Sequence, residues 1–317
     1  MEGRLVILPR DGLHKTSMFL VGTARRCILA VGSQSEGLLA TPYVQQMADA
    51  LKGEWAIAHV VLGSSHVGRS APSHEADADD VDAALALLVK EHSMDEVVLY
   101  ASGTGVQVAL EALASAAHAE VVTRVILQGG IVSPQRSKLF SVAATKRRLE
   151  TARALIAEKR GDDTTAMAKV YDMAVTPARL SRNATLTVQE ALWQPVLGES
   201  ESTCKQTLRG VTVPTLFLLS TEASYTAAAK DAVPAVQRAA RDAIGLPAED
   251  VQVTLLPTTI DEHRCALNGN GALAVKAVSD FLQRADARRA QLESDATIVA
   301  LEAKQKKDVA LVNGVCA

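Results

Sequence analysis

The chain has 317 residues, of which 48% are hydrophobic, 22% are charged and only 3% are aromatic, and its formal net charge is −3. A charge balance this close to neutral supplies no electrostatic drive towards nucleic acid or an anionic membrane surface. The length and hydrophobic content predict a sizeable core built mainly from Ala, Val and Leu, and they argue against a disordered chain.

Cysteine and histidine spacing predicts neither disulfides nor a metal site. The four cysteines are far apart and form no CxxC pair: Cys27, Cys204, Cys265 and Cys316. Such spacing favours a reducing compartment. His66 and His74 lie eight residues apart without a third ligand nearby. The first residues contain no apolar signal segment, and no apolar run approaches the roughly 18 residues of a spanning helix. We therefore expect a cytoplasmic protein without a cofactor or a membrane span.

Short apolar runs alternate with segments of helical periodicity along most of the chain. Strands are predicted at 27–31, 55–62, 96–100, 122–127, 213–219 and 251–256, and helices at 43–51, 76–89, 106–118, 227–244 and 272–282. Near-continuous apolar strands separated by amphipathic helices indicate a mostly parallel sheet that is covered on both faces. Residues 5–8 and 17–21 are expected to add antiparallel strands at one edge.

Two segments depart from this alternation. Residues 134–209 are helical and polar, and an insertion of this size between two strands is where a cap would lie. A long charged helix is predicted from 285 to about 309, with a thin apolar stripe at Leu292, Ala296, Val299 and Ala303. This stripe either packs on its own domain or binds a protein partner. The predicted organisation is one domain over 1–285 and a helical extension over 286–317.

The segment from 97 to 107, VVLYASGTGVQ, is the most informative for function. A strand leads into a helix through small residues, as in the nucleophile elbow G-x-S-x-G, where crowding requires small residues two positions before and after the nucleophile. Centring the pattern on Gly103 puts Ala101 and Gly105 at these positions, whereas centring it on Ser102 would put bulkier residues there. Gly103, which has no nucleophilic atom, therefore stands at the nucleophile position. A small-residue turn of this kind is also common in doubly wound sheets, where it can bind an anion.

Four motifs in chain order resemble an uncharacterised eukaryotic family of α/β-hydrolase-fold proteins from fungi, plants and protozoa. They are the glycine loop VGSQSEGL at 31–38, the serine-rich loop LGSSHVGRS at 62–70, the elbow at 101–107 and the stretch VILQGGIVS at 125–133. The resemblance covers roughly residues 25–140 and continues more weakly to about 285. It implies an α/β-hydrolase fold, with a mostly parallel sheet, a helical cap insertion and a C-terminal helical extension.

The same resemblance implies where the residues of a serine hydrolase would lie. The serine of the family falls on Gly103, and the acid falls on Ala223, with Glu222 one residue earlier. The histidine is expected at His263. Loss of the nucleophile alone costs on the order of 10⁶ in rate, and losing its partners afterwards costs little more. Loss of both the nucleophile and the acid is therefore typical of a non-catalytic descendant.

Three functions follow from these positions. The first is a hydrolase-like protein that has lost catalysis and serves in binding or as a subunit of an assembly. The second is an active hydrolase of small esters or acyl groups that uses Ser102 with His263 and Glu222. The third is a binder of anionic small molecules, because the backbone at Gly32 and Ser33 and the N–H of Thr104 would still supply the donors of an oxyanion hole.

Overall fold

The computed structural model describes residues 2–9, 16–33, 36–39, 43–65, 74–129, 142–168, 175–183, 202–220, 229–256, 259–261, 266–268 and 271–315. It divides into two compact units, Met1–Lys276 and Ala277–Ala317.

The first unit is built on an eight-stranded sheet with the order β1-β2-β4-β3-β5-β6-β7-β8. The strands are β1 (Arg4–Ile7), β2 (Ser17–Val21), β3 (Arg26–Val31), β4 (Ala56–Val61), β5 (Glu96–Ser102), β6 (Val122–Gln128), β7 (Thr215–Ser220) and β8 (Val251–Leu256). β1 and β2 pair antiparallel, as do β2 and β4, and the remaining pairs are parallel. The predicted mostly parallel sheet and its two antiparallel strands at one edge are confirmed. A two-stranded hairpin of β9 (Thr259–Asp261) and β10 (Ala266–Asn268) was not predicted.

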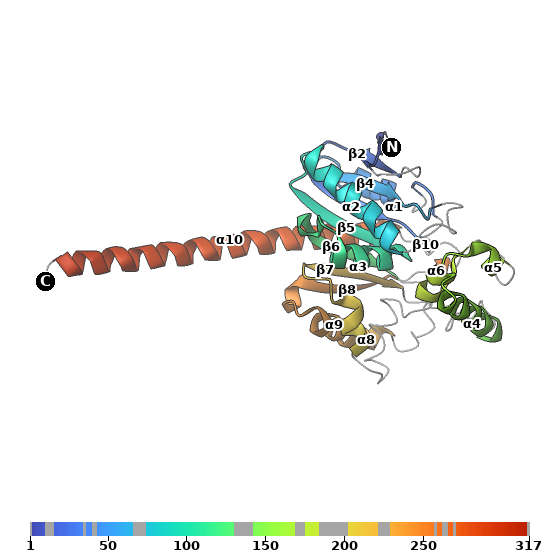
Figure 1. The fold of residues 1–317 in the computed structure, drawn as a ribbon. Coiled ribbons are helices and arrows are strands. Elements are labelled where there is room, and N and C mark those ends of the chain that lie inside the picture. The colour runs from blue at the N-terminus through green and yellow to red at the C-terminus, as the bar shows by residue number, and fades with distance from the viewer. Residues whose placement is uncertain are drawn as a thin grey trace. The chain divides into compact units, whose positions relative to one another are not determined.

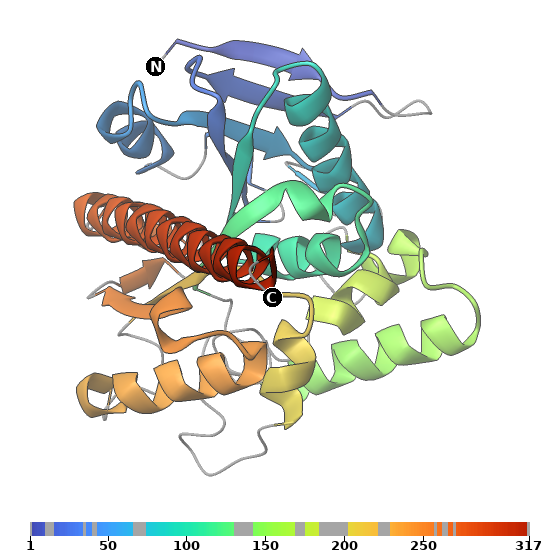
Figure 2. The same cartoon turned by 90° about the vertical axis from the view of Figure 1, so that its left-hand side faces the viewer.

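Helices connect the strands and cover the sheet. They are α1 (Tyr43–Ala50), α2 (His74–Lys90), α3 (Gly105–Ser115), α4 (Val142–Ala157), α5 (Thr164–Ala168), α6 (Pro177–Asn183), α8 (Ser202–Leu208), α9 (Ala229–Ile244) and α10 (Gly271–Val315). Figure 2 shows α1 on the opposite side of the strands from α2 and α3. Both faces of the central strands are therefore covered, and every residue of β5 is buried.

The main apolar cluster joins one face of the sheet to four helices. Alternate residues of β3 and β5, such as Cys27, Leu29, Val97 and Leu99, are buried with side chains of α2, α3, α8 and α9. Alternate positions of a strand point to the same face, so this cluster is the packed core on that side.

Helices α4, α5 and α6 have a smaller apolar cluster of their own. Its buried members are Leu149, Ala152, Leu155, Met167, Val175 and Leu180. Figure 1 shows the three helices next to one another, and we refer to them as the α4–α6 group. Helix α8 also falls within residues 134–209, but its Cys204 and Leu208 belong to the main cluster.

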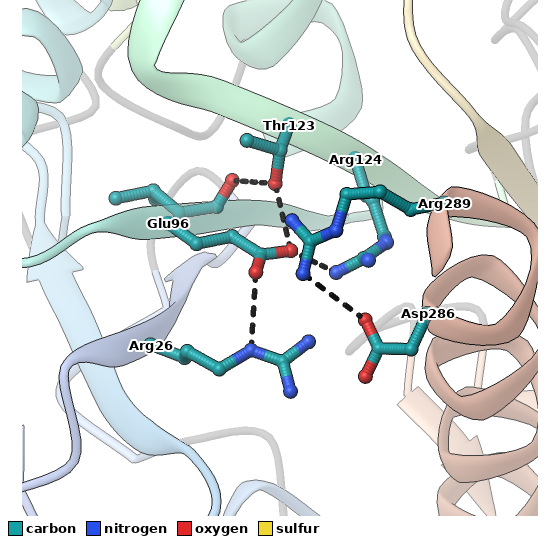
Figure 3. A network of polar contacts seen from close by, with 7 residues as sticks. Arg26, Glu96, Thr123, Arg124, Asp286 and Arg289 are labelled. Atoms are coloured by element: carbon teal, nitrogen blue, oxygen red, sulfur yellow. Dashed lines mark hydrogen bonds and ion pairs between the residues drawn. The ribbon is translucent and has the colours of Figure 1, made fainter. Parts of the chain in front are cut away.

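A buried charged cluster lies at the amino ends of β3, β5 and β6 (Figure 3). The Glu96 carboxylate accepts hydrogen bonds from Arg124, from Arg26 at 3.1 Å and from the Thr123 hydroxyl at 3.0 Å. The Arg26 guanidinium also lies over the Trp55 ring, 3.9 Å from its centroid. Arg26, Glu96 and Arg124 lie at or near the starts of β3, β5 and β6, and both guanidinium groups bind the one carboxylate. The cluster therefore holds the amino ends of these three strands together.

Helix α10 runs without interruption through the two helices predicted at 272–282 and from 285 to about 309. Gln283 and Arg284, which lie between them, supply neither the glycine nor the proline that would end a helix. Within the second unit, Arg289 lies 3.7 Å from Asp286 one turn earlier, as Figure 3 also shows. Side chains from residue 289 to residue 300 are exposed. Among the described helices, none combines the length and hydrophobicity needed to cross a lipid bilayer.

Candidate functional site

The carboxyl ends of β3 and β5 mark the point where the direction of the sheet's connections reverses. From β3 the chain continues to β4 on one side, and from β4 it continues to β5 on the other side of β3. In open α/β sheets, ligands bind outside the carboxyl ends of the strands at such a switch point. Residues 32–33 and 36–39 follow β3 and the turn at 103–104 follows β5, so the described parts of both predicted motifs lie at this switch point.

Gly103 makes the turn from β5 into α3. Its φ is +58°, in the left-handed region of backbone conformation. The Gly103 N–H donates to the Gln128 carbonyl oxygen at 3.2 Å, and the Gly103 carbonyl oxygen accepts from the Val106 N–H at 3.2 Å. The chain thus passes from the last residue of the strand, Ser102, to the first residue of the helix, Gly105, through only two residues. A side chain at this φ would be strained by roughly 1–2 kcal/mol.

Gly105 is a glycine because two backbone groups approach it closely. A Cβ added there would lie 2.4 Å from the Gly32 carbonyl oxygen and 2.6 Å from the Val31 carbonyl oxygen. Both atoms belong to the backbone, so no side-chain rotation can relieve the contact. This crowding is the physical reason for the small residue that the elbow pattern centred on Gly103 requires at position 105.

Ser33, Ser102 and Thr104 are brought together around Gly103. All three residues are buried, with exposed fractions of 5%, 3% and 7% for the whole residue. The Ser33 hydroxyl donates to the Ser102 carbonyl oxygen at 3.2 Å, and this bond ties the end of β5 to the loop after β3. With Ser102 this deeply buried, its hydroxyl is poorly placed to attack a substrate.

The Glu36 carboxylate is hydrogen-bonded to the Ser33 N–H, one of the backbone donors predicted to bind an oxyanion. The Ser33 N–H donates to Glu36 Oε2 at 2.8 Å, and the Glu36 N–H donates to the Ser33 carbonyl oxygen at 3.0 Å. Burial raises the pKa of Glu36, and the bond from Ser33 opposes that rise. Glu36 was not among the predicted site residues. Its spacing from Ser33, S-x-x-E, is that of a capping box and was the available signal.

His59 on β4 is a second site residue that the sequence analysis missed. Its Nδ1 accepts the Leu39 N–H at 3.0 Å, so the neutral ring carries its proton on Nε2. Burial lowers the pKa of His59 to about 4, which leaves the ring neutral at pH 7. A Cβ added at Gly32 would meet Glu36 Oε2 at 3.1 Å and His59 Nε2 at 3.3 Å. Gly32 therefore lies between these two side chains, and His59 holds the far end of the loop.

Acidic residues of α2 hold the start of the serine-rich loop after β4. Ser64 donates its N–H and its hydroxyl to the two oxygens of Asp77, at 3.1 and 2.6 Å. The Gly63 N–H donates to Asp80 Oδ2 at 2.8 Å. Arg179 of α6 completes the cluster, with its Nη2 2.7 Å from Asp77 Oδ2 and 3.1 Å from Ser64 Oγ. In this part of the loop, Ser64 has a structural role.

The predicted acid and histidine positions, Glu222, Ala223 and His263, lie outside the described residues, as do His66 and Cys265. Cys27 is a buried thiol whose pKa is raised by burial to about 12, so it is no nucleophile. Within the described ranges, no group of three His, Cys, Asp or Glu side chains is arranged to hold a metal ion.

Comparison with known proteins identifies the fold and the family. The model of the family described as "Protein of unknown function (DUF1749)" matches residues 14–249. A solved structure described as an "Alpha/Beta hydrolase fold protein of unknown function" is 34% identical, with a TM-score of 0.76, and the match covers 92% of this chain and 98% of that one. Among curated proteins, none matches the chain.

Two solved hydrolases share the fold at much lower identity. The siderophore hydrolase EstB from Aspergillus fumigatus is 15% identical, with a TM-score of 0.61 and coverage of 90% of this chain and 97% of its own. A thermostable carboxyl esterase from Bacillus coagulans is 10% identical, with a TM-score of 0.59 and coverage of 89% and 98%. The α/β-hydrolase fold predicted from the sequence is confirmed, and the chain belongs to the DUF1749 family of proteins of unknown function.

Proposed function

We propose that this protein has lost serine-hydrolase catalysis and uses the α/β-hydrolase fold for binding or as a subunit of an assembly. The observation that carries the proposal is Gly103. It stands where the elbow pattern puts the nucleophile, and it has the left-handed φ of a turn between strand and helix. It offers no atom that could attack a substrate. Loss of the nucleophile costs on the order of 10⁶ in rate.

The engagement of Ser33 by Glu36 supports the same proposal independently. An oxyanion hole works through N–H donors that are ready to receive the charge developing in the transition state. Here the Ser33 N–H is 2.8 Å from a carboxylate of the same chain. Removing one such donor costs about 10²–10³ in rate in a working enzyme. A chain that already lacks the nucleophile loses no further activity when Glu36 binds the Ser33 N–H.

The alternative is an active esterase-like hydrolase that uses Ser102 with His263 and Glu222. It draws support from the two hydrolases with the same fold, the siderophore hydrolase and the carboxyl esterase. Burial of Ser102 to 3% exposure weighs against it, because the substrate would have to displace the surrounding chain.

Covalent labelling separates these two functions. The native chain is treated with a fluorophosphonate probe, and the adduct is detected by intact-mass measurement. Hydrolysis of p-nitrophenyl acetate is measured as well, because this ester is small enough to enter a confined site. We expect no stoichiometric adduct and no turnover above background. A single Gly103→Ser substitution should rescue little activity, since Glu36 still engages Ser33. An adduct on the native chain that Ser102→Ala abolishes would overturn the proposal in favour of the alternative.

We also propose that helix α10 binds a protein partner. Leu292 and Val299 are 50% and 64% exposed, and their spacing of seven residues puts them on one face two turns apart. Deleting residues 286–317 should abolish association while urea unfolding of the remaining chain stays cooperative. The paired substitution Leu292→Asp and Val299→Asp should also abolish association, as measured by light scattering and by co-purification of the partner. Ile156→Asp, at an exposed apolar position on α4, is the control. Association that survives the paired substitution would contradict this role.

A cytoplasmic location is part of the proposal. Cys27 and Cys204 are buried thiols, which fits a reducing compartment. Imaging of the tagged chain in intact cells tests this location.

A further inference from the structure

A completely buried ion pair joins the α4–α6 group to the body of the first unit. Arg179 of α6 and Asp77 of α2 are 102 residues apart in sequence, and their side chains are 0% exposed. The Arg179 guanidinium also donates to Ser64, whose N–H and hydroxyl are both bound to Asp77. One cation thus fastens a helix of the group to the loop after β4.

The α4–α6 group has the internal contacts of a body that can stay together. Its six buried apolar residues form a cluster separate from the main core. The Ala178 N–H donates to the Gly161 carbonyl oxygen at 3.0 Å, and the Arg179 N–H donates to the Thr176 hydroxyl at 3.1 Å. The first bond ties α6 to the segment between α4 and α5, and the second lies within the first turn of α6 itself. Neither bond has to break when the group moves as a whole.

Fastening by a charge pair differs from fastening by apolar surface. A buried ion pair gives up the hydration of both groups, and its net contribution is small compared with an apolar contact of similar size. Separating the pair returns both charges to water and recovers that hydration. A charge pair at this junction therefore holds the group in place and still permits reversible opening. Removing one partner alone is far more disruptive, because the other charge stays buried without compensation.

The position of the pair relates it to the switch point. β3 and β4 are parallel neighbours, so the loops that leave their carboxyl ends are adjacent. Ser64 lies in the loop after β4, and residues 32–33 and 36–39 follow β3. We propose that Arg179 is a latch that holds the α4–α6 group closed beside this edge of the sheet, and that the group opens as one body when the latch breaks.

Hydrogen exchange read by mass spectrometry tests the latch on the full chain. We expect Arg179→Met to speed exchange in peptides from α4 and from α6 together, by at least roughly tenfold, while peptides from β5 and β6 keep their rates. Adding Asp77→Asn to this variant should restore part of the protection, because no uncompensated charge is then buried. Arg160→Met is the matched control, since Arg160 is an exposed arginine of the same group, paired with Asp163.

Three results would overturn the latch. Equal acceleration in β5 and β6 would show that the pair stabilises the whole unit. Acceleration confined to α6 would show local fraying. Unchanged exchange in Arg179→Met would show that the pair holds nothing. If Arg179→Met does not fold, Arg179→Lys is the second variant, because lysine keeps the positive charge on a shorter side chain. Exchange should then rise in α4 and α6 together, by a smaller factor than in Arg179→Met.

Discussion

Gly103 and Gly105 are both glycines, but for different physical reasons. Gly103 needs the left-handed φ, whereas Gly105 needs space because backbone carbonyl oxygens face its α-carbon. Both residues lie in the strand-to-helix turn that was predicted, because steric rules for such a turn can be applied to a string of residues. Glu36 was not predicted, since the return of that side chain to Ser33 depends on how the loop folds.

Replacing Gly105 by alanine should destabilise the protein by about 3 kcal/mol, the upper end of the usual cost of overpacking, because neither carbonyl can give way without moving the end of β3. Gly161→Ala is the control, since a Cβ there meets its nearest neighbour at an ordinary 3.6 Å. Urea midpoints of the two variants and the native chain measure the difference. Equal midpoints for the two variants would contradict the close approach at Gly105.

His59 gives the protein a defined sensitivity to acid. Because burial lowers its folded-state pKa from 6.5 to about 4, the unfolded chain binds more protons between these two values. Stability is therefore lost as the pH falls through this window, by roughly 3 kcal/mol in total. His59→Gln should flatten the pH dependence of the urea midpoint between pH 6.5 and 4. A slope unchanged from that of the native chain would assign the effect to other groups.

At the scale of elements, the strands were the easiest to predict. Their apolar runs are short and continuous because both faces are covered, so six strands of the parallel part are close to their predicted positions. The hairpin of β9 and β10 was missed because three-residue strands are too short for a period to be recognised. The pairing of Arg179 with Asp77 had no signal in the sequence, since no local rule connects residues this far apart.

The starts of the strands depend on Glu96. Glu96→Ala leaves Arg124, which is 3% exposed, without its carboxylate, and we expect a loss of about 3–5 kcal/mol in the free energy of unfolding. The neighbouring pair of Asp95 with Arg25 is exposed to 59% and 68%, so Asp95→Ala should lower the free energy of unfolding far less than Glu96→Ala. Chemical denaturation of both variants makes the comparison. Similar losses would show that burial of the cluster contributes little.

At the scale of the whole molecule, the two compact units differ in what supports them. The first unit has a sheet, covering helices and a large buried cluster. In the second unit, the part of α10 from 289 to 300 has exposed side chains. A helix without tertiary packing is marginal in water, because most helical stability in proteins comes from the packing of an apolar face.

Amides of residues 290–300 should therefore exchange far faster than those of 272–282, where Val278 and Phe281 are buried. Hydrogen exchange of the purified chain at low concentration measures both segments. Strong protection of 290–300 under these conditions would show that another chain already covers this part of the helix. Protection that rises with protein concentration would identify that chain as a second copy.

The glycine at position 103 also affects how freely the rest of the sequence can vary. A side chain held at a φ of +58° stores roughly 1–2 kcal/mol of backbone strain, and glycine removes it. Natural domains are stable by only about 5–15 kcal/mol, and an average substitution costs about 1 kcal/mol. A chain relieved of this strain can accept about one more destabilising change before it unfolds. Position 103 thus widens the set of sequences that this fold tolerates.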